Sequence, residues 1–456
     1  MKKIGLLAAP LLAALATGAL GQSVDPGVPL VQNGNTTVNV FGRGQMLGVL
    51  ENVADPVRDN NRVYLFMKES RLGTKGDYDG LFKYDVQMAY GGEDANGSNT
   101  DMSLLDFSAD VPLKPLGDNT ILKIGQFRVP FSREGLTDTG YMDFHDRSIA
   151  NMASYQGRDY GLALMGTKNN WTGTIGTFSG GGPNVPQRYL PENLGIPEVV
   201  ARFGYNDGVD QDIYHVVQQD LNLTRTTKAA YVSALFTRDT AIGHSTPLLV
   251  HTNGAPNLLI NPDYNPYINN AGAYNGYQNS IGSANSLSLG DMYMLEADGV
   301  IRHPLGNGQS VEGEVEGSWG GYQNTTGVIH IASARAQGDY QIGPYGVALR
   351  YALLSMDDNA GYIGTAAGAK GPTNYHGASM GEPIQEITPS LTWHVKGDNL
   401  KIVADLSIYP NCPTFLDPTL GMYAFPDPTA TNEDTVAGGT HRSTVSEARM
   451  MFQFMF

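Results

Sequence analysis

Apolar and polar side chains alternate along most of this chain, and a period of two residues is typical of β-strands whose two faces meet different surroundings. The last predicted strand shows this most clearly, because one of its faces is wholly apolar: Ala448, Met450, Phe452, Phe454 and Phe456. Its other face carries Glu447, Arg449, Met451, Gln453 and Met455. The alternation recurs in 82–90, 311–319 and 400–408, where full charges face apolar residues or glycine. A strand that lies between lipid and water requires this arrangement.

The alternating segments predict an all-β fold, a transmembrane antiparallel β-barrel. Hydrocarbon offers no partner to backbone N–H and C=O groups, so a sheet that spans a bilayer must close on itself. We predict about sixteen strands, an even number as in other bacterial barrels. Their residues are 37–50, 61–74, 77–90, 101–113, 119–129, 158–168, 170–179, 198–205, 225–239, 288–304, 309–322, 326–341, 343–356, 383–396, 398–410 and 443–456.

The links between the predicted strands alternate in length. Links after even-numbered strands are mostly short, as at Lys75-Gly76 and Asn169. Links after odd-numbered strands are mostly long: 130–157, 180–197, 240–287, 357–382 and 411–442. Short periplasmic turns and long extracellular loops are typical of outer-membrane barrels. The long link 206–224 and the short link near Gln323 are exceptions, so that counts from about 14 to about 18 strands stay open. A soluble β-sandwich is the alternative fold, which the unbroken pattern without domain linkers disfavours.

The N-terminal residues have the pattern of a secretory signal peptide. Lys2 and Lys3 precede an apolar stretch at 4–15, and Ala19 and Gly21 are the small residues that a signal peptidase reads. We expect a cleaved signal peptide at 1–21, an N-terminal periplasmic segment at 22–36 and the barrel at 37–456. The expected location is an outer membrane of Gram-negative type, in contact with its lipid and lipopolysaccharide.

Composition and motifs exclude several function classes. The net charge of −16 lacks the basic footprint of a nucleic-acid binder. Cys412 is the single cysteine, so disulfide frameworks and cysteine-rich metal centres are excluded, and no role follows for this thiol. The sequence contains no catalytic motif and no metal-ligand spacing. We therefore expect no enzyme activity, no cofactor and no metal.

Several motifs together resemble the phosphate-selective porin O/P family. They are the stretch Ile124–Glu134, which contains Gly-Gln-Phe-Arg-Val-Pro-Phe, the triplet Asp146-Arg147-Ser148, the stretch Gly157–Leu162, which begins Gly-Arg-Asp-Tyr-Gly, and the strand Gly173–Gly180. The resemblance covers roughly residues 119–182. It implies a homotrimeric, sixteen-stranded outer-membrane channel in which one loop folds inward and narrows the pore.

The best candidate for the inward loop is 130–157, between the fifth and sixth predicted strands. A loop of this length without secondary structure of its own is usually functional. Inside a lumen, its charges would set the potential that passing ions meet. The alternative is an exposed loop whose ion pairs tie it to the wall. The candidate constriction residues in and beside the loop are Arg128, Arg133, Glu134, Asp143, His145, Asp146, Arg147, Arg158 and Asp159.

Because successive residues of a strand face opposite sides of the wall, the position of a residue along its strand (its parity) predicts which charged residues line the pore. Those we select are Lys83, Arg302, Glu312, Glu314, Glu316, Arg350, Lys401 and Arg449. The glutamates 312, 314 and 316 would form a negative strip, which favours a general or cation-tolerant pore. A few arginines at the narrowest point would outweigh them, because screening confines each charge to about 8–10 Å. Parity does not tell how far along the pore axis each residue lies, so both an anion-selective and a cation-tolerant pore stay open.

Three functions compete at this stage. The first is a porin for passive diffusion of small ions and solutes, with phosphate or other anions as permeants. A general or cation-tolerant porin is its nearest alternative. A structural or adhesion barrel, working through extracellular loops such as 240–287, is the second. A barrel enzyme is the third, but the sequence offers no pair of nucleophile and base.

Overall fold

The computed structural model describes residues 27–54, 59–90, 102–117, 119–151, 156–179, 196–210, 213–214, 216–218, 223–241, 250–252, 255–257, 289–324, 327–356, 382–413, 416–417, 421–422 and 442–456. Predictions on the signal peptide and on most of loop 240–287 lie outside them. Among the described residues, no helix has the length and apolar character to cross a membrane.

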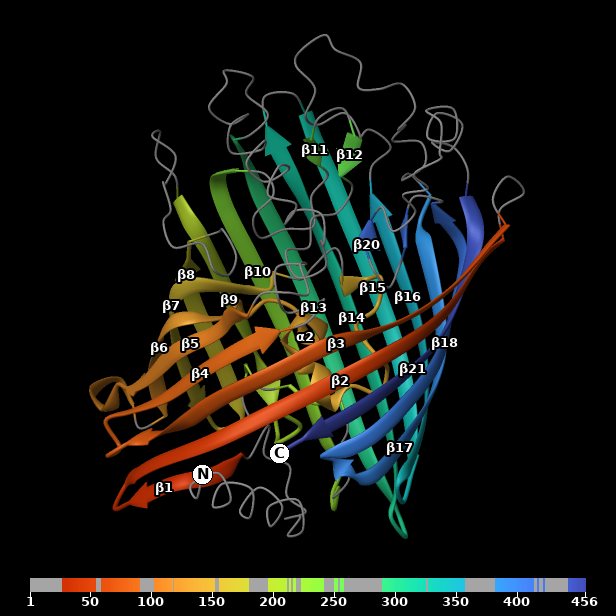
Figure 1. The fold of residues 1–456 in the computed structure, drawn as a ribbon. Helices are drawn as coiled ribbons and strands as arrows, with labels where there is room; N and C mark the ends of the chain where they lie inside the picture. The colour runs from red at the N-terminus through yellow and green to blue at the C-terminus, as the bar shows by residue number, and fades with distance from the viewer. Residues whose placement is uncertain are drawn as a thin grey trace, which may run out of the picture.

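The described strands form a closed antiparallel barrel of sixteen strands (Figure 1). Each strand pairs with the next along the chain, and the last pairs with the first, so the sheet has no free edge. The wall consists of β2 (Thr36–Ala54), β3 (Asp59–Tyr78), β4 (Phe82–Tyr90), β5 (Ser103–Pro112), β6 (Thr120–Arg128), β7 (Arg158–Lys168), β8 (Trp171–Phe178), β9 (Ile196–Asn206), β10 (Thr227–Ala241), β13 (Leu289–Gly306), β14 (Gln309–Asn324), β15 (Gly327–Ile342), β16 (Tyr345–Met356), β17 (Ile384–Asp398), β18 (Leu400–Pro413) and β21 (Arg442–Met455). The predicted fold class is confirmed, and each wall strand overlaps a predicted strand.

Outside the wall, the described chain forms short elements. Besides the helical turns of the inner loop, these are β1 (Val28–Asn33), η1 (Lys114–Leu116) and two small hairpins, β11 (Val250–Thr252) with β12 (Ala255–Asn257) and β19 (Leu416–Asp417) with β20 (Gly421–Met422). Strand β1 falls within the predicted segment 22–36. It pairs with the start of β2, from Thr36 to Val40, whereas β21 pairs with β2 from Arg43 onward. Strand β1 therefore lies in line with β21, along the same edge of β2.

One predicted turn is wrong. The link expected at Lys75-Gly76 lies inside β3, where Gly76 is paired with Val38 on one side and Tyr84 on the other. The chain reverses instead at Asp79 and Gly80, whose φ angles are 52° and 69°. Asp and Gly tolerate this left-handed conformation, so the Asp-Gly pair was the stronger turn signal.

The burial pattern of the barrel is the reverse of that of a soluble protein. Outward-facing apolar side chains such as Leu65, Leu391 and Met450 are 60–70% exposed, while the inward-facing Lys68 and Glu447 are fully buried. An apolar belt outside and charges inside are what a barrel in lipid requires. The predicted alternation of the last strand is confirmed, since Phe452 and Phe454 face outward and Arg449 faces inward.

The seam between the first and last strands combines glycine with aromatic residues. Gly44 is paired with Phe454, and Gly42 exchanges backbone hydrogen bonds of 3.1 and 3.0 Å with Phe456. A Cβ atom at either glycine would collide with the phenylalanine ring that lies over it. The two glycines therefore make room for the rings that cover the seam.

Two segments fill much of the lumen. The loop that follows β6 runs inside the barrel and forms α2 (Arg133–Leu136) and η2 (Thr139–Tyr141) (Figure 1). The described residues of the link between β9 and β10 also lie inside, with Ile213 and Val216 1% exposed. Their apolar side chains pack into one cluster with the wall, which includes Phe127, Phe131, Leu136, Ile149, Ile213 and Val216. The barrel thus has a packed core at the level of these two segments.

Candidate functional site

The inner loop is shaped by its own side-chain caps. Ser132 caps α2, as its Oγ accepts a hydrogen bond of 2.9 Å from the backbone N–H of Gly135. Asp138 caps η2 by accepting a bond of 2.8 Å from the backbone N–H of Gly140. Such caps satisfy the backbone donors that a short helical turn leaves unpaired. The loop therefore has a defined conformation although it contains little regular structure.

Glu134 holds the two halves of the loop together and ties them to the wall. Its carboxylate accepts hydrogen bonds from the backbone N–H and the Oγ of Ser148, at 2.8 and 2.6 Å. It also lies 3.4 Å from the guanidinium of Arg335 and 3.6 Å from that of Arg350. Arg147 donates to the backbone oxygens of Glu134 and Thr137, at 3.1 and 3.0 Å. Buried charges are stable when they are paired in this way.

The second inward segment, between β9 and β10, is locked to the inner loop. Arg133 donates two hydrogen bonds to Asp210 of this segment, at 2.8 and 2.9 Å, and both side chains are fully buried. The backbone N–H of Asp138 donates to the oxygen of Val216 at 3.2 Å, and that of Gln218 donates to Tyr141 at 3.1 Å. The exceptional link 206–224 therefore marks no miscounted strand. Its described residues form a second lumen-filling segment, which follows β9 at the end of the barrel where the short turns lie.

Arginines pair with the carboxylates of the acidic wall that the sequence predicted. The predicted negative strip on β14 is paired throughout: Glu312 with Arg302, Glu314 with Arg133 and Arg335, and Glu316 with Arg335. On the neighbouring β13, Glu296 and Asp298 are both paired with Arg202, at 3.1 and 2.6 Å. All of these side chains are at least nine-tenths buried. These five carboxylates are thus paired and packed, whereas Asp339 on the neighbouring β15 has an oxygen without a hydrogen-bond partner among the described residues.

The remaining predicted lining residues hold the inner loop from the opposite wall. Arg350 is paired with Glu386 at 2.6 Å and stacks on the ring of Phe144, 4.3 Å from its centroid. Lys401 donates to the backbone oxygen of Met142 at 3.0 Å. Arg449 is paired with Asp405 at 2.7 Å. Lys83 differs from these residues, since it lies exposed on β4.

The other loop residues lie close to these anchors. The Nδ1 of His145 lies 2.9 Å from Asp405, and Asp146 lies 3.5 Å from Lys68. Burial, assisted by the charge of Arg449, lowers the pKa of His145, so the imidazole is neutral at neutral pH. Burial and the nearby Glu312 raise the pKa of Asp143 well above its ordinary value. Neither carboxylate oxygen of Asp143 has a hydrogen-bond partner among the described residues.

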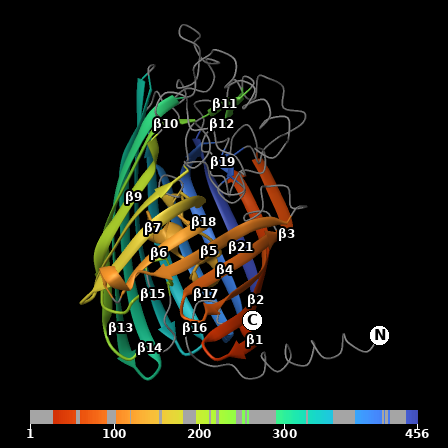
Figure 2. The same cartoon turned by 90° about the vertical axis from the view of Figure 1, so that its left-hand side faces the viewer.

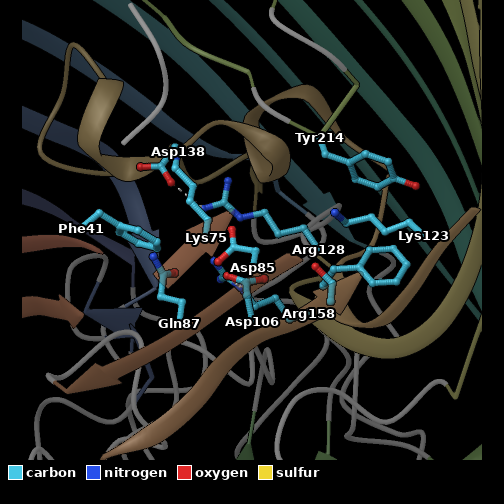
Figure 3. Close-up of a pocket in the computed structure, with 12 residues that line it drawn as sticks. Phe41, Lys75, Asp85, Gln87, Asp106, Lys123, Arg128, Asp138, Arg158 and Tyr214 are labelled. Atoms are coloured by element: carbon cyan, nitrogen blue, oxygen red, sulfur yellow. Dashed lines mark hydrogen bonds and ion pairs between the residues drawn. The ribbon is translucent and has the colours of Figure 1, made fainter. Parts of the chain in front are cut away.

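A polar cavity remains between the inward segments and the wall formed by β2 to β7 (Figure 3). Its volume is about 60 Å³, and it opens to solvent. The basic residues that line it are Lys75, Lys123, Arg128 and Arg158, and the acidic ones are Asp85, Asp106 and Asp138. Of the predicted constriction residues, Arg128 and Arg158 line this cavity, while Asp159 lies beside it and accepts a hydrogen bond from the backbone N–H of Tyr160 at 2.7 Å.

The acidic residues of the cavity are held by arginines. Both carboxylate oxygens of Asp106 lie 3.0 Å from the Nε of Arg158. Asp138 is surrounded by Arg43, Arg71 and Arg128. Although burial alone would raise it, these three guanidiniums hold the pKa of Asp138 well below its usual value. Glu69 also pairs with Arg43 and Arg71, so three guanidiniums face two carboxylates and leave this end of the cavity net positive.

Aromatic rings flank the lysine on the other side of the cavity. The Nζ of Lys123 lies 5.5 Å from the centroid of Phe127 and 5.3 Å from that of Tyr214, and it is paired with Asp110 at 2.9 Å. Tyr214 comes from the second inward segment, and a hydrogen bond of 3.1 Å joins its hydroxyl to Thr174. In Figure 3 the ring of Tyr214 stands over Lys123 at the edge of the cavity.

Three residues of the cavity are not among those predicted from the sequence: Lys75, Lys123 and Tyr214. Lys75 was assigned to a turn that lies elsewhere. Lys123 alternates with the outward-facing Leu122 and Ile124, so its parity already indicated an inward direction. Tyr214 had no signal of this kind, because parity applies to strands and this residue lies in a link.

Comparison with protein families gives one match. Residues 47–238 match the family model described as phosphate-selective porin O and P. The match includes the motifs around Arg128 and Arg158, the inner loop and the second inward segment. A comparison with curated protein sequences finds no match.

Solved structures agree with the barrel fold. OprB of Pseudomonas putida aligns with a TM-score of 0.51 and 10% identity, over 92% of this chain and 94% of that one. The anion-selective porin from Comamonas acidovorans has a TM-score of 0.49 and 12% identity, over 92% and 100% of the two chains. The outer membrane channel DcaP of Acinetobacter baumannii has a TM-score of 0.48 and 9% identity, over 93% and 99%. At these identities the likeness to OprB concerns the fold alone.

Proposed function

Since residues 47–238 of this chain match the model of the phosphate-selective porin O and P family, we propose that this outer-membrane porin conducts small anions, phosphate among them, along the basic side of its lumen. The family match supports a channel and not an enzyme. The observation that carries the choice of anions is the cavity beside β2 to β7, because basic residues outnumber acidic ones in its lining.

The paired state of the acidic wall supports the same choice. Glu312, Glu314 and Glu316 each have an arginine partner and are buried behind the inward segments. Paired charges produce a weak field at a distance, and salt screens what remains within about 8–10 Å. A passing ion therefore meets mainly the residues that line the cavity.

The cavity offers an anion both attraction and release. An anion that loses water at a constriction must gain N–H donors, and the guanidiniums of Arg128 and Arg158 supply them. Conduction also requires that binding stay weak enough for the ion to leave. Asp106 and Asp138 meet this requirement, since they compete with the anion for the same arginines.

Reversal potentials in a salt gradient test the proposal. Mature protein, refolded and inserted in planar bilayers, is expected to be anion-selective, and Arg158→Gln and Lys123→Gln are expected to reduce that preference. Arg225→Gln is the matched control, because Arg225 is exposed and does not line the cavity. A wild-type channel that passes mainly cations would refute the anion path and favour the cation-tolerant alternative.

We propose also that the mature chain, released from a signal peptide at 1–21, assembles as a homotrimer. Its wall is low on one side, where β4, β5 and β6 have 9, 10 and 9 residues, whereas β2 and β3 have 19 and 20. A strand needs roughly 9–11 residues to cross the hydrocarbon, so the low side is at the lower limit. Contact with neighbouring copies there would cover it. Native mass spectrometry of protein purified in mild detergent tests this, and a monomer at all concentrations would contradict it.

A further inference from the structure

A hollow in the outer surface lies at the end of the barrel where the short turns are, over β6 to β9. Its volume is about 930 Å³. It includes the turn at Asn169, through which β7 passes into β8, and this turn belongs to the same end as the C-terminus. The strands that form it face the viewer in Figure 2. In an outer-membrane barrel this end is periplasmic, so the hollow lies at the level of the periplasmic leaflet.

Small residues form the floor of the hollow. Thr120, Gly166 and Gly173 are successive cross-strand partners, and Phe203 is the next residue in the same row. A Cβ atom on Gly166 would have its nearest neighbour, the Oγ1 of Thr120, at 3.8 Å, so the space above this glycine is open. Over Gly166 the wall is therefore one side-chain layer thinner than in the surrounding apolar belt, whereas the ring of Phe203 covers Gly173, 3.0 Å from the position of a Cβ atom there.

Large apolar residues form the sides. Trp171 and Phe203 are stacked at 5.3 Å with an angle of 13° between their rings, and both are about half exposed. Ile175 and Leu164 border the hollow toward the middle of the membrane. An apolar groove bounded by aromatic side chains at the membrane interface is suited to bind an acyl chain.

A cation stands at the periplasmic rim of the hollow. Lys168 is exposed and has no carboxylate partner among the described residues. The side-chain amides of Asn119 and Asn169 lie at the same rim. Lysine at a lipid interface places its stem along apolar surface and its ammonium at the level of the headgroups. The rim thus provides a positive charge and N–H donors where a lipid phosphate would lie.

We propose that this hollow binds a glycerophospholipid of the periplasmic leaflet, with an acyl chain over Gly166 beside the ring of Phe203 and its phosphate at Lys168. The apolar groove and the cation are arranged in the same order as the tail and the headgroup of such a lipid. The site lies outside the lumen, so it is independent of the proposed anion path.

Native mass spectrometry of protein extracted in mild detergent tests the proposal. We expect wild-type protein to retain a phospholipid, and we expect Lys168→Gln and Gly166→Leu to reduce the retained fraction several-fold. Lys228→Gln is the matched control: Lys228 is also exposed at this rim, beside the ring of Tyr205, but does not line the hollow. Addition of phosphatidylglycerol to delipidated protein should restore the bound state in wild type and in Lys228→Gln.

Three results would overturn the inference. Equal retention in all variants would show that the hollow binds no lipid of this kind. Equal loss in Lys228→Gln would indicate unspecific lipid around the barrel. A change of oligomeric state in Gly166→Leu, without a change in bound lipid, would identify the hollow as a contact between copies of the chain. Single-channel selectivity should be the same in all variants, so failure of the anion proposal is detected separately. Lys168 is exposed, so Lys168→Gln is expected to fold and keeps the test informative if Gly166→Leu misfolds.

Discussion

At the scale of single residues, buried arginines decide which carboxylates an ion can meet. Arg133 is the central example, since it joins the inner loop, the second inward segment and the wall through Asp210 and Glu314. Loss of one partner of a buried ion pair leaves the other charge without compensation, which costs about 3–5 kcal/mol. The lumen of this barrel therefore depends on its charges for stability as well as for conduction.

We predict that Arg133→Met lowers the free energy of unfolding by about 3–5 kcal/mol, because Asp210 and Glu314 lose their shared cation. Urea unfolding of the refolded barrel measures this. Arg225→Gln, at an exposed position, should leave the midpoint unchanged. An unchanged midpoint in Arg133→Met would mean that the pairing contributes little.

Tyr214 is predicted to narrow the basic cavity. Tyr214→Ala removes a ring that stands over Lys123, so single-channel conductance should rise, and Tyr214→Phe should stay near wild type because it keeps the ring. Tyr345→Ala, on the outward face, is the control. Equal conductance in Tyr214→Ala and wild type would place the path elsewhere.

At the scale of elements, the inner loop is a folded unit that its caps and contacts hold in the lumen. Ser132→Ala removes the cap of α2 and should cost about 1 kcal/mol of stability. We expect the variant to show increased current noise in single-channel recordings, since the loop samples more conformations. Thr224→Ala, at an exposed position outside the loop, is its control. A quiet channel with unchanged stability would contradict a role for the cap.

The loop also makes stability depend on pH through Asp143. Its pKa is higher in the folded state than in the unfolded one, so the folded protein binds the extra proton and stability falls as pH rises above the ordinary carboxyl range. Asp143→Asn should therefore stabilise the protein at about pH 8 and have little effect below about pH 4, where the carboxyl is protonated in both states. Urea midpoints at the two pH values measure this, with Asp79→Asn in an exposed turn as control. A destabilised variant at the higher pH would reverse the sign and refute the assignment.

At the scale of the whole molecule, the charges are divided between two sides of the lumen. The β13 and β14 side carries the paired and packed carboxylates, and the β2 to β7 side borders the cavity. Because the basic residues of the second side attract anions through their electrostatic field, this attraction should weaken as salt concentration rises. We predict that anion preference at a fixed concentration ratio falls as mean ionic strength rises from about 0.1 M to about 1 M, where the Debye length shrinks from about 10 Å to about 3 Å. A preference independent of salt would indicate direct coordination instead of a field.

The sequence sufficed for the wall but not for the contents of the barrel. Each wall strand was predictable because a strand between lipid and water must alternate, as Val315 and Glu316 do. Parity gave the inward direction of Glu314 but not its partners, which are Arg133 of the inner loop, far away in the sequence, and Arg335 on the neighbouring strand β15. The link 206–224 was recognised as exceptional by its length, yet nothing in its residues indicated that Asp210 would meet Arg133. Partners across a lumen depend on three-dimensional closure, which periodicity does not encode.

The seam between β2 and β21 has a consequence for biogenesis. Phe454 and Phe456 cover glycines of β2, so barrel closure joins two segments that lie far apart in the sequence. A ribosome product that stops before β21 would leave β2 and β18 with unpaired backbone edges, and such edges recruit other strands. Quality control in the periplasm would then meet one of two products: a closed barrel, or an open sheet that is prone to aggregate.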